Sequence, residues 1–228
     1  MSDHGTTPGG GAPRRIATPG MLLALGALLA VVALLSVALA GGSGKPALPG
    51  GVRQSAPGSG FLGTLALPAR PAPAIDLHDD RGRHVTLAAY RGKAVLVTFL
   101  YTHCPDVCPL IASNLGVALN QLGARRSQAQ LIAISVDPRG DTPAAVARFL
   151  AAHRLSGRME YLLGSPAQLA RTWAAWSVGS SREVGQPDRV AHSALVYGIT
   201  ASGVLKTLYP ASFDPGQIVH DVPRLAAG

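Results

Sequence analysis

The chain has two cysteines, Cys104 and Cys108, and they lie four positions apart in the segment CPDVCP. Two neighbouring thiolates can cycle between a dithiol and a disulfide, or they can bind a soft metal ion. A disulfide between them would close a very short loop and would contribute little stabilisation through chain entropy. The pair therefore indicates redox or metal chemistry more than a structural cross-link.

The cysteine pair lies between a predicted strand and a predicted helix. Residues 94–101, AVLVTFLY, are typical of a strand that is covered on both faces, and residues 107–122 carry an apolar stripe at helical spacing. Pro105 favours an extended backbone at Cys104, which we therefore place in the connecting loop. We place Cys108 at the start of the helix, where the dipole and the free N–H groups favour a thiolate.

A histidine far away in the sequence completes a candidate metal site. His192 directly precedes a second apolar run, residues 193–200, which we predict to be a strand. If that strand is antiparallel to residues 94–101, its start lies at the sheet edge that carries the cysteines. Two thiolates and one imidazole suit copper, because soft sulfur selects Cu(I) and imidazole binds both copper states. We therefore predict Cys104, Cys108 and His192 as metal ligands.

The surrounding sequence alternates strand and helix patterns. This alternation predicts an α/β sandwich around a mixed central sheet. The remaining predicted elements are a hairpin (74–77 and 84–87), a strand (131–136), a helix capped at residue 142 (142–153), a short strand (161–163), a helix (165–176), a second hairpin (193–200 and 204–208) and a last helix from residue 215.

The amino-terminal third is predicted to lie outside this domain. Residues 1–20 are rich in Gly, Pro, Ser and Thr, and we interpret them as a disordered cytoplasmic segment. Residues 21–40 contain no charge and would span ~30 Å as a helix, which is the thickness of a bilayer core. Residues 41–73, with many glycines and prolines, are predicted to be a linker, and residues 74–228 the folded domain.

The charges flanking residues 21–40 predict the orientation of this segment. Arg14 and Arg15 precede it, so the positive-inside rule leaves the amino terminus in the cytoplasm and the domain outside, on the periplasmic side in a bacterium. The alternative is a cleaved signal peptide, because Ala38-Leu39-Ala40 matches a cleavage site. Both interpretations export the domain.

The net charge of +8 comes from 20 Lys and Arg against 12 Asp and Glu. No run of basic residues is longer than two, and the aromatic residues, 5% of the chain, are not interleaved with them. This distribution disfavours a nucleic-acid partner. An acidic protein partner or an anionic membrane surface fits the charge better.

Residues 97–110, VTFLYTHCPDVCPL, resemble the signature of the Sco/SenC family, the copper chaperones of cytochrome c oxidase assembly. Further stretches resemble the family in the same order, and the resemblance covers roughly residues 72–226. These stretches are residues 134–138 with 141–143, residues 163–166 and residues 192–194.

The resemblance implies a thioredoxin-like fold with a copper site, for Cu(I), Cu(II) or both, formed by Cys104, Cys108 and His192. The family usually has an aspartate just before the ligand histidine, whereas this chain has Ala191. By resemblance, the protein is expected to be membrane-anchored and to deliver copper to the dinuclear copper site in subunit II of cytochrome c oxidase, or to a related copper protein. The alternative is a thiol–disulfide oxidoreductase acting on cysteines of the oxidase or of another exported protein, and a third possibility is a redox or copper sensor.

Overall fold

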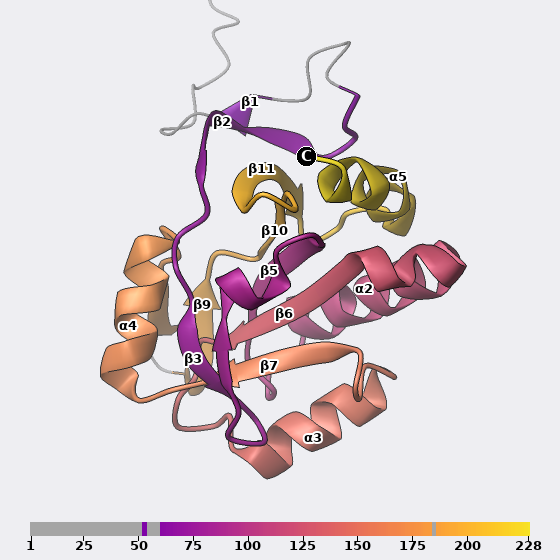
Figure 1. Ribbon diagram of the computed structural model, residues 1–228. Coiled ribbons are helices and arrows are strands. Elements are labelled where there is room, and N and C mark those ends of the chain that lie inside the picture. The colour runs from indigo at the N-terminus through magenta and orange to yellow at the C-terminus, as the bar shows by residue number, and fades with distance from the viewer. Residues whose placement is uncertain (1–51, 54–59, 184–185) are drawn as a thin grey trace, which may run out of the picture. The chain divides into compact units, whose positions relative to one another are not determined.

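The computed structural model describes residues 52–53, 60–183 and 186–228 (Figure 1). The predicted segments 1–20 and 21–40 and the first part of the linker lie outside these residues. The strands are β1 (Val52–Arg53), β2 (Thr64–Pro71), β3 (Asp76–Asp79), β4 (His84–Thr86), β5 (Ala94–Leu100), β6 (Ala129–Ser135), β7 (Met159–Leu163), β8 (Ser180–Glu183), β9 (Gln186–His192), β10 (Leu195–Ile199) and β11 (Val204–Pro210). The helices are η1 (Leu87–Tyr90), α2 (Val107–Leu122), η2 (Gly123–Gln128), α3 (Pro143–Ala152), α4 (Pro166–Ala175) and α5 (Pro215–Ala226).

In the described part of the chain, a mixed sheet has the strand order β1-β2-β11-β10-β5-β6-β7-β3-β4. Strands β5, β6 and β7 are parallel, and β10 is antiparallel to β5, with Val196 opposite Thr98. The carboxyl end of β5 and the start of β10 therefore lie at one sheet edge. This confirms the predicted α/β sandwich and the antiparallel arrangement on which the His192 prediction depended.

Helices cover both faces of this sheet. The crossovers β5–α2–β6 and β6–α3–β7 step across the sheet in the same direction, so right-handed connections place α2 and α3 on one face. Helix α5 lies beside α2 (Figure 1). Tyr161 of β7 contacts Phe149 of α3, whereas Phe99 of β5 points to the other face and contacts Trp176 just after α4.

The predicted helix starts are confirmed. The Thr142 hydroxyl accepts a hydrogen bond from the Ala145 N–H at 3.2 Å, and Pro143 occupies the first position of α3. Ser165 begins α4 with a capping box. These N-caps fix the residues at which α3 and α4 begin.

The prediction of a linker over residues 41–73 is wrong for residues 64–71, because they form strand β2. This strand pairs with β11, and the segment before it is held by buried Asp221, which accepts hydrogen bonds from the N–H groups of Leu62 and Gly63. Pro68 and Pro71 lack an N–H group, but the outer edge of β2 faces only the two-residue β1, so unpaired positions are tolerated. The domain therefore begins before residue 74.

One helical stretch among the described residues, Val107–Gln128, is long and apolar enough to cross a membrane. It consists of α2 and η2. Side chains along one side of α2 are fully buried in the domain core, among them Cys108, Ile111 and Leu115. We therefore assign it to the core rather than to a membrane. The predicted anchor, residues 21–40, is not among the described residues.

Candidate metal centre

Residues 101–109, here termed the thiol loop, connect β5 to the first turn of α2. The N–H of Cys104 donates to the Tyr101 carbonyl at 3.3 Å, which turns the chain just after the strand. The N–H of Cys108, in the first turn of α2, donates to Cys104 Sγ at 3.4 Å. Cys104 lies in the loop and Cys108 at the helix start, as predicted, and the helix terminus holds the first sulfur.

His192 lies against this sulfur pair across 84 residues of sequence. Its Nε2 atom is 3.7 Å from Cys108 Sγ, and its Nδ1 atom faces the Ser193 carbonyl at 3.3 Å. The Tyr101 ring meets the imidazole edge-on, with centroids 5.9 Å apart. One detail of the prediction is wrong: His192 is the last residue of a strand, β9, which pairs antiparallel with β8, and β10 begins only at Leu195.

The separation of Cys108 and His192 fits two ligands of one metal ion. Metal bonds of ~2.3 Å to sulfur and ~2.0 Å to nitrogen, the values known for zinc, place the two donors ~3.7 Å apart at a trigonal angle. Cys104, with its sulfur against the Cys108 amide, supplies a further soft donor. Within the described residues, no group of three or more His, Cys, Asp or Glu side chains is already arranged around a metal position. Cys108 and His192 are thus at the spacing of two metal ligands, and the Cys104 sulfur lies against the Cys108 amide beside them.

The two thiols differ strongly in acidity. The hydrogen bond from the Cys108 thiol, together with the N–H groups of Asp106 and Cys108, lowers the pKa of Cys104 to about 5 against the opposing effect of burial. The pKa of Cys108 is raised, because its thiol donates to Cys104 and is buried. At neutral pH the pair therefore holds one thiolate and one thiol, and a bound cation would favour loss of the second proton.

Burial also lowers the pKa of His192, which keeps the imidazole neutral at neutral pH. A neutral imidazole is the form that binds a metal ion. The site therefore presents one thiolate, one thiol and one neutral imidazole, a donor set suited to copper.

A shallow pocket of about 190 Å³ connects this site to solvent. It is formed by the thiol loop on one side and by β9 on the other. Ala191, at the position where the Sco/SenC resemblance leads one to expect an aspartate, lines this pocket and brings no carboxylate to it. The lining residues are Tyr101, Cys104, Pro105, Asp106, Val107, Val190, Ala191 and His192.

Asp141 positions the thiol loop, a role that the sequence did not reveal. Its buried carboxylate accepts hydrogen bonds from the Thr102 N–H (2.7 Å), the Ser135 hydroxyl (2.6 Å) and the Tyr161 hydroxyl (2.9 Å). Burial raises the pKa of this carboxyl despite these donors. The Asp-Thr-Pro sequence is typical of a helix start, and Thr142 does cap α3, but Asp141 turns inward and ties the loop to β6 and β7.

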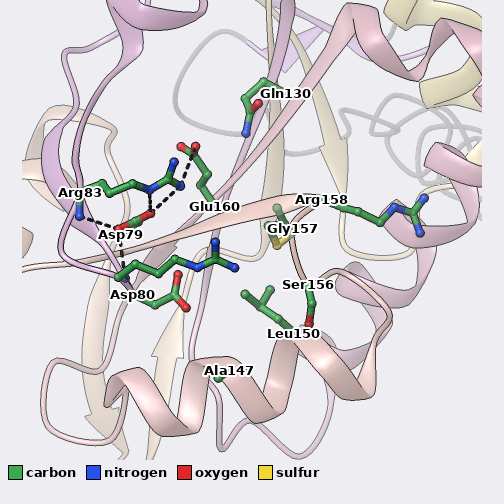
Figure 2. Close-up of a pocket in the computed structure, with 12 residues that line it drawn as sticks. Asp79, Asp80, Arg83, Gln130, Ala147, Leu150, Ser156, Gly157, Arg158 and Glu160 are labelled. Atoms are coloured by element: carbon green, nitrogen blue, oxygen red, sulfur yellow. Dashed lines mark hydrogen bonds and ion pairs between the residues drawn. The ribbon is translucent and has the colours of Figure 1, made fainter.

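A polar pocket of about 330 Å³ lies at the opposite edge of the sheet, near the amino-terminal ends of β6 and β7 (Figure 2). Arg83 is held there between Asp79 and Glu160, at 2.7 and 3.6 Å (Figure 2). No cysteine or histidine is among its lining residues. We attribute these charges to the stability of the β3–β4 hairpin rather than to metal chemistry.

A family model described as SCO1/SenC matches residues 67–227. The chain belongs to the SCO1/SenC family. This membership confirms the family that the thiol-loop sequence resembles, and the match begins within β2, before the predicted domain start at residue 74.

Curated relatives of this Sco/SenC chain come from animals and bacteria. The mitochondrial SCO2 homologue of Bos taurus is 33% identical over 155 residues, covering 66% of this chain and 58% of the relative. The SCO1 homologue of Bacillus subtilis (strain 168) is 28% identical over 146 residues, covering 62% and 75%. The chain thus spans about three fifths of the length of the mitochondrial relatives it matches.

Solved structures of Sco proteins share this fold. Copper-bound ScoI of Bradyrhizobium japonicum superposes with a TM-score of 0.61 at 29% identity, covering 68% of this chain and 99% of that one. Apo Sco1 from Thermus thermophilus gives a TM-score of 0.62 at 30% identity, covering 72% and 96%. The mixed α/β architecture is therefore that of Sco proteins.

Proposed function

We propose that this Sco/SenC protein binds one copper ion through Cys104, Cys108 and His192. The observation that carries the proposal is the distance of 3.7 Å between Cys108 Sγ and His192 Nε2. These two atoms come from distant parts of the chain, and their distance is that expected for two ligands of one metal ion. The acidic Cys104 thiol adds a second sulfur donor. Two relatives support copper as the ion: the ScoI structure contains it, and a Stutzerimonas stutzeri protein 34% identical over 105 residues is described as a putative copper-binding protein.

We further propose that the protein is anchored by residues 21–40 and delivers copper, on the extracytoplasmic side, to the dinuclear site of cytochrome c oxidase subunit II. Copper is then the cargo. Cu(I) is a soft ion and binds thiolates more strongly than it binds imidazole. We therefore expect His192 to be the ligand that an incoming thiolate of the acceptor displaces, while Cys104, at the pocket, remains in contact until the transfer is complete.

Transfer to an acceptor tests this function. The reduced full chain, loaded with one equivalent of Cu(I), is mixed with the copper-free soluble domain of subunit II, and copper in the separated proteins is measured. We expect copper to move to the acceptor, and Cys104→Ser/Cys108→Ser to carry none. Failure of the parent chain to retain Cu(I) would refute copper binding. Retention without transfer would refute delivery to subunit II.

The acidity difference between the thiols favours a second candidate, a thiol–disulfide reductase. The Cys104 thiolate would attack one sulfur of a target disulfide and form a mixed disulfide with it. The other sulfur of the target would leave as a thiolate. After losing its proton, Cys108 would attack Cys104 Sγ and release the reduced target, leaving a Cys104–Cys108 disulfide. Rapid copper-free reduction of an oxidised subunit II domain by the reduced chain, lost in Cys108→Ser at the second step, would favour this function.

A further inference from the structure

The helical face next to the thiol loop carries exposed charge of one sign. From residue 107 to residue 158 the chain contains six arginines, two aspartates, and no lysine or glutamate. Both aspartates, Asp137 and Asp141, are buried, at 5% and 4% exposure. The exposed charge of this stretch is therefore positive throughout. The arginines are Arg125, Arg126, Arg139, Arg148, Arg154 and Arg158.

Helices α2 and α3 form one continuous surface. Gly116 of α2 lies so close to α3 that a side chain there would meet the His153 carbonyl at 3.4 Å. The Ser113 hydroxyl and His153 Nδ1 are 3.2 Å apart, and Arg158 donates to the Asn120 side chain at 2.8 Å. These contacts join the exposed stripe of α2 to the carboxyl-terminal end of α3. We call the exposed surface of α2, η2, α3, the loop at Arg139 and the segment after α3 with Arg154 and Arg158 the arginine face.

The arginine face also exposes apolar side chains. Among the described residues, the large hydrophobic side chains that are exposed are Leu62, Leu110 and Val117, and the last two are 43% and 42% accessible. Leu110 and Val117 are seven positions apart on α2 and therefore share one side of the helix. Apolar groups combined with arginine, and without acidic side chains, are characteristic of protein-binding surfaces.

A groove joins this face to the thiol loop. It has a volume of about 330 Å³ and lies between the loop and α3. The thiol pocket, with Cys104 and His192, is lined by other residues of the same loop. A protein seated in the groove would therefore lie beside the metal ligands. The side chains that line the groove include Thr102, His103, Pro109, Arg148, Phe149 and His153.

We propose that the arginine face docks an acidic surface on the protein that receives copper from Cys104 and Cys108. The inference rests on the proposed function. It adds where on this chain the acceptor protein binds and that the acceptor's binding surface is acidic. The complementarity is specific to a protein, because the groove and the Leu110–Val117 pair offer shape and apolar contact at the site of exchange. Long-range attraction between the two charged surfaces would raise the association rate by at least ~10-fold.

Charge reversal of two arginines tests the proposal. Arg148 lies on α3 and Arg154 follows its carboxyl-terminal end; both are exposed, and neither is a candidate ligand. The association rate of the reduced full chain with the soluble domain of subunit II is measured at ~50 mM and ~500 mM salt. We expect Arg148→Glu/Arg154→Glu to slow association at least ~10-fold at low salt, and the difference to shrink at high salt, where charges are screened. Arg70→Glu/Arg171→Glu, which reverses exposed arginines of β2 and α4, is the matched control and should associate nearly like the parent.

Copper binding, measured on the same variants, separates this inference from the proposed function. We expect both double variants to retain Cu(I) like the parent. If Cu(I) is retained and the α3 variant associates as fast as the control, the docking face is refuted while the proposed function stands. If the parent chain does not associate with the soluble domain of subunit II at low salt, the docking face is also refuted. If the α3 variant loses only its binding to vesicles containing 30% phosphatidylglycerol, the face is a membrane surface and the protein-docking proposal is wrong.

Discussion

His192 shows most directly how single residues make the site. Because its nitrogen lies 3.7 Å from Cys108 Sγ, we expect His192→Ala to remain folded and to weaken copper retention by at least ~10-fold. Cu(II) should be affected more than Cu(I), since two thiolates still satisfy the softer ion. Competition with a chelator, under reduction for Cu(I), measures both affinities. His78→Ala, an exposed histidine of β3, is the control, and parental affinity of His192→Ala for both ions would reduce the site to a dithiol.

Asp141 acts on the site through the backbone of the thiol loop. In Asp141→Asn, an amide NH₂ replaces an oxygen that accepts from the Ser135 and Tyr161 hydroxyls, so buried donors lose their acceptor. We expect the free energy of unfolding to fall by about 1–3 kcal/mol. Urea denaturation measures this change. Asp106→Asn is the matched control, because Asp106 is exposed and its side chain makes no capping hydrogen bond, and an equal effect of both substitutions would contradict the role of Asp141.

At the scale of elements, the β3–β4 hairpin depends on one ionised carboxylate. Burial raises the pKa of Asp79, but hydrogen bonds from the N–H and guanidinium of Arg83 and from the N–H of Arg81 outweigh it, and the pKa lies below its usual range. A lowered folded-state pKa stabilises the fold above pH ~4, and this stabilisation is lost as the pH falls through the folded-state pKa.

The hairpin therefore gives a pH-dependent prediction. We expect Asp79→Asn to lower the free energy of unfolding by about 1–2 kcal/mol at pH 7, a modest value because Arg83 is largely exposed. The difference from the parent should shrink as the pH falls below ~4 and through the lowered folded-state pKa of Asp79. Chemical denaturation across this pH range is the measurement, with Asp80→Asn as a neighbouring control. A difference that stays constant with pH would contradict an ionised Asp79.

Sequence patterns predicted some elements well and others not at all. Apolar periodicity identified α2 and the buried strands, and the Thr142-Pro143 and Ser165-Pro166 starts identified α3 and α4. Strand β2 was missed because its prolines are typical of a linker, although pairing with β11 tolerates them. The β8–β9 hairpin was missed because its sequence is polar and lacks clear alternation. His192 was placed at the correct sheet edge even so, because the start of β10 and the end of β9 adjoin.

At the scale of the whole molecule, the proposed function requires the copper-binding domain to lie outside the membrane. If residues 21–40 anchor the chain, the protein should stay with membranes after alkaline carbonate extraction, and protease should reach the domain only from the outer side. Fractionation of cells that express the full chain checks both points. Release of a soluble form beginning near residue 41 would show that the apolar segment is a cleaved signal peptide.

The central claim is that two cysteines and one distant histidine hold a single copper ion. X-ray absorption spectroscopy of the full chain, loaded with one equivalent of Cu(I) under reduction, tests this claim most directly. We predict two sulfur neighbours and one imidazole nitrogen around the copper, with the nitrogen lost in His192→Ala and copper uptake lost in Cys104→Ser/Cys108→Ser. A sulfur-only environment in the parent chain, or undiminished copper uptake by the double cysteine variant, would contradict it.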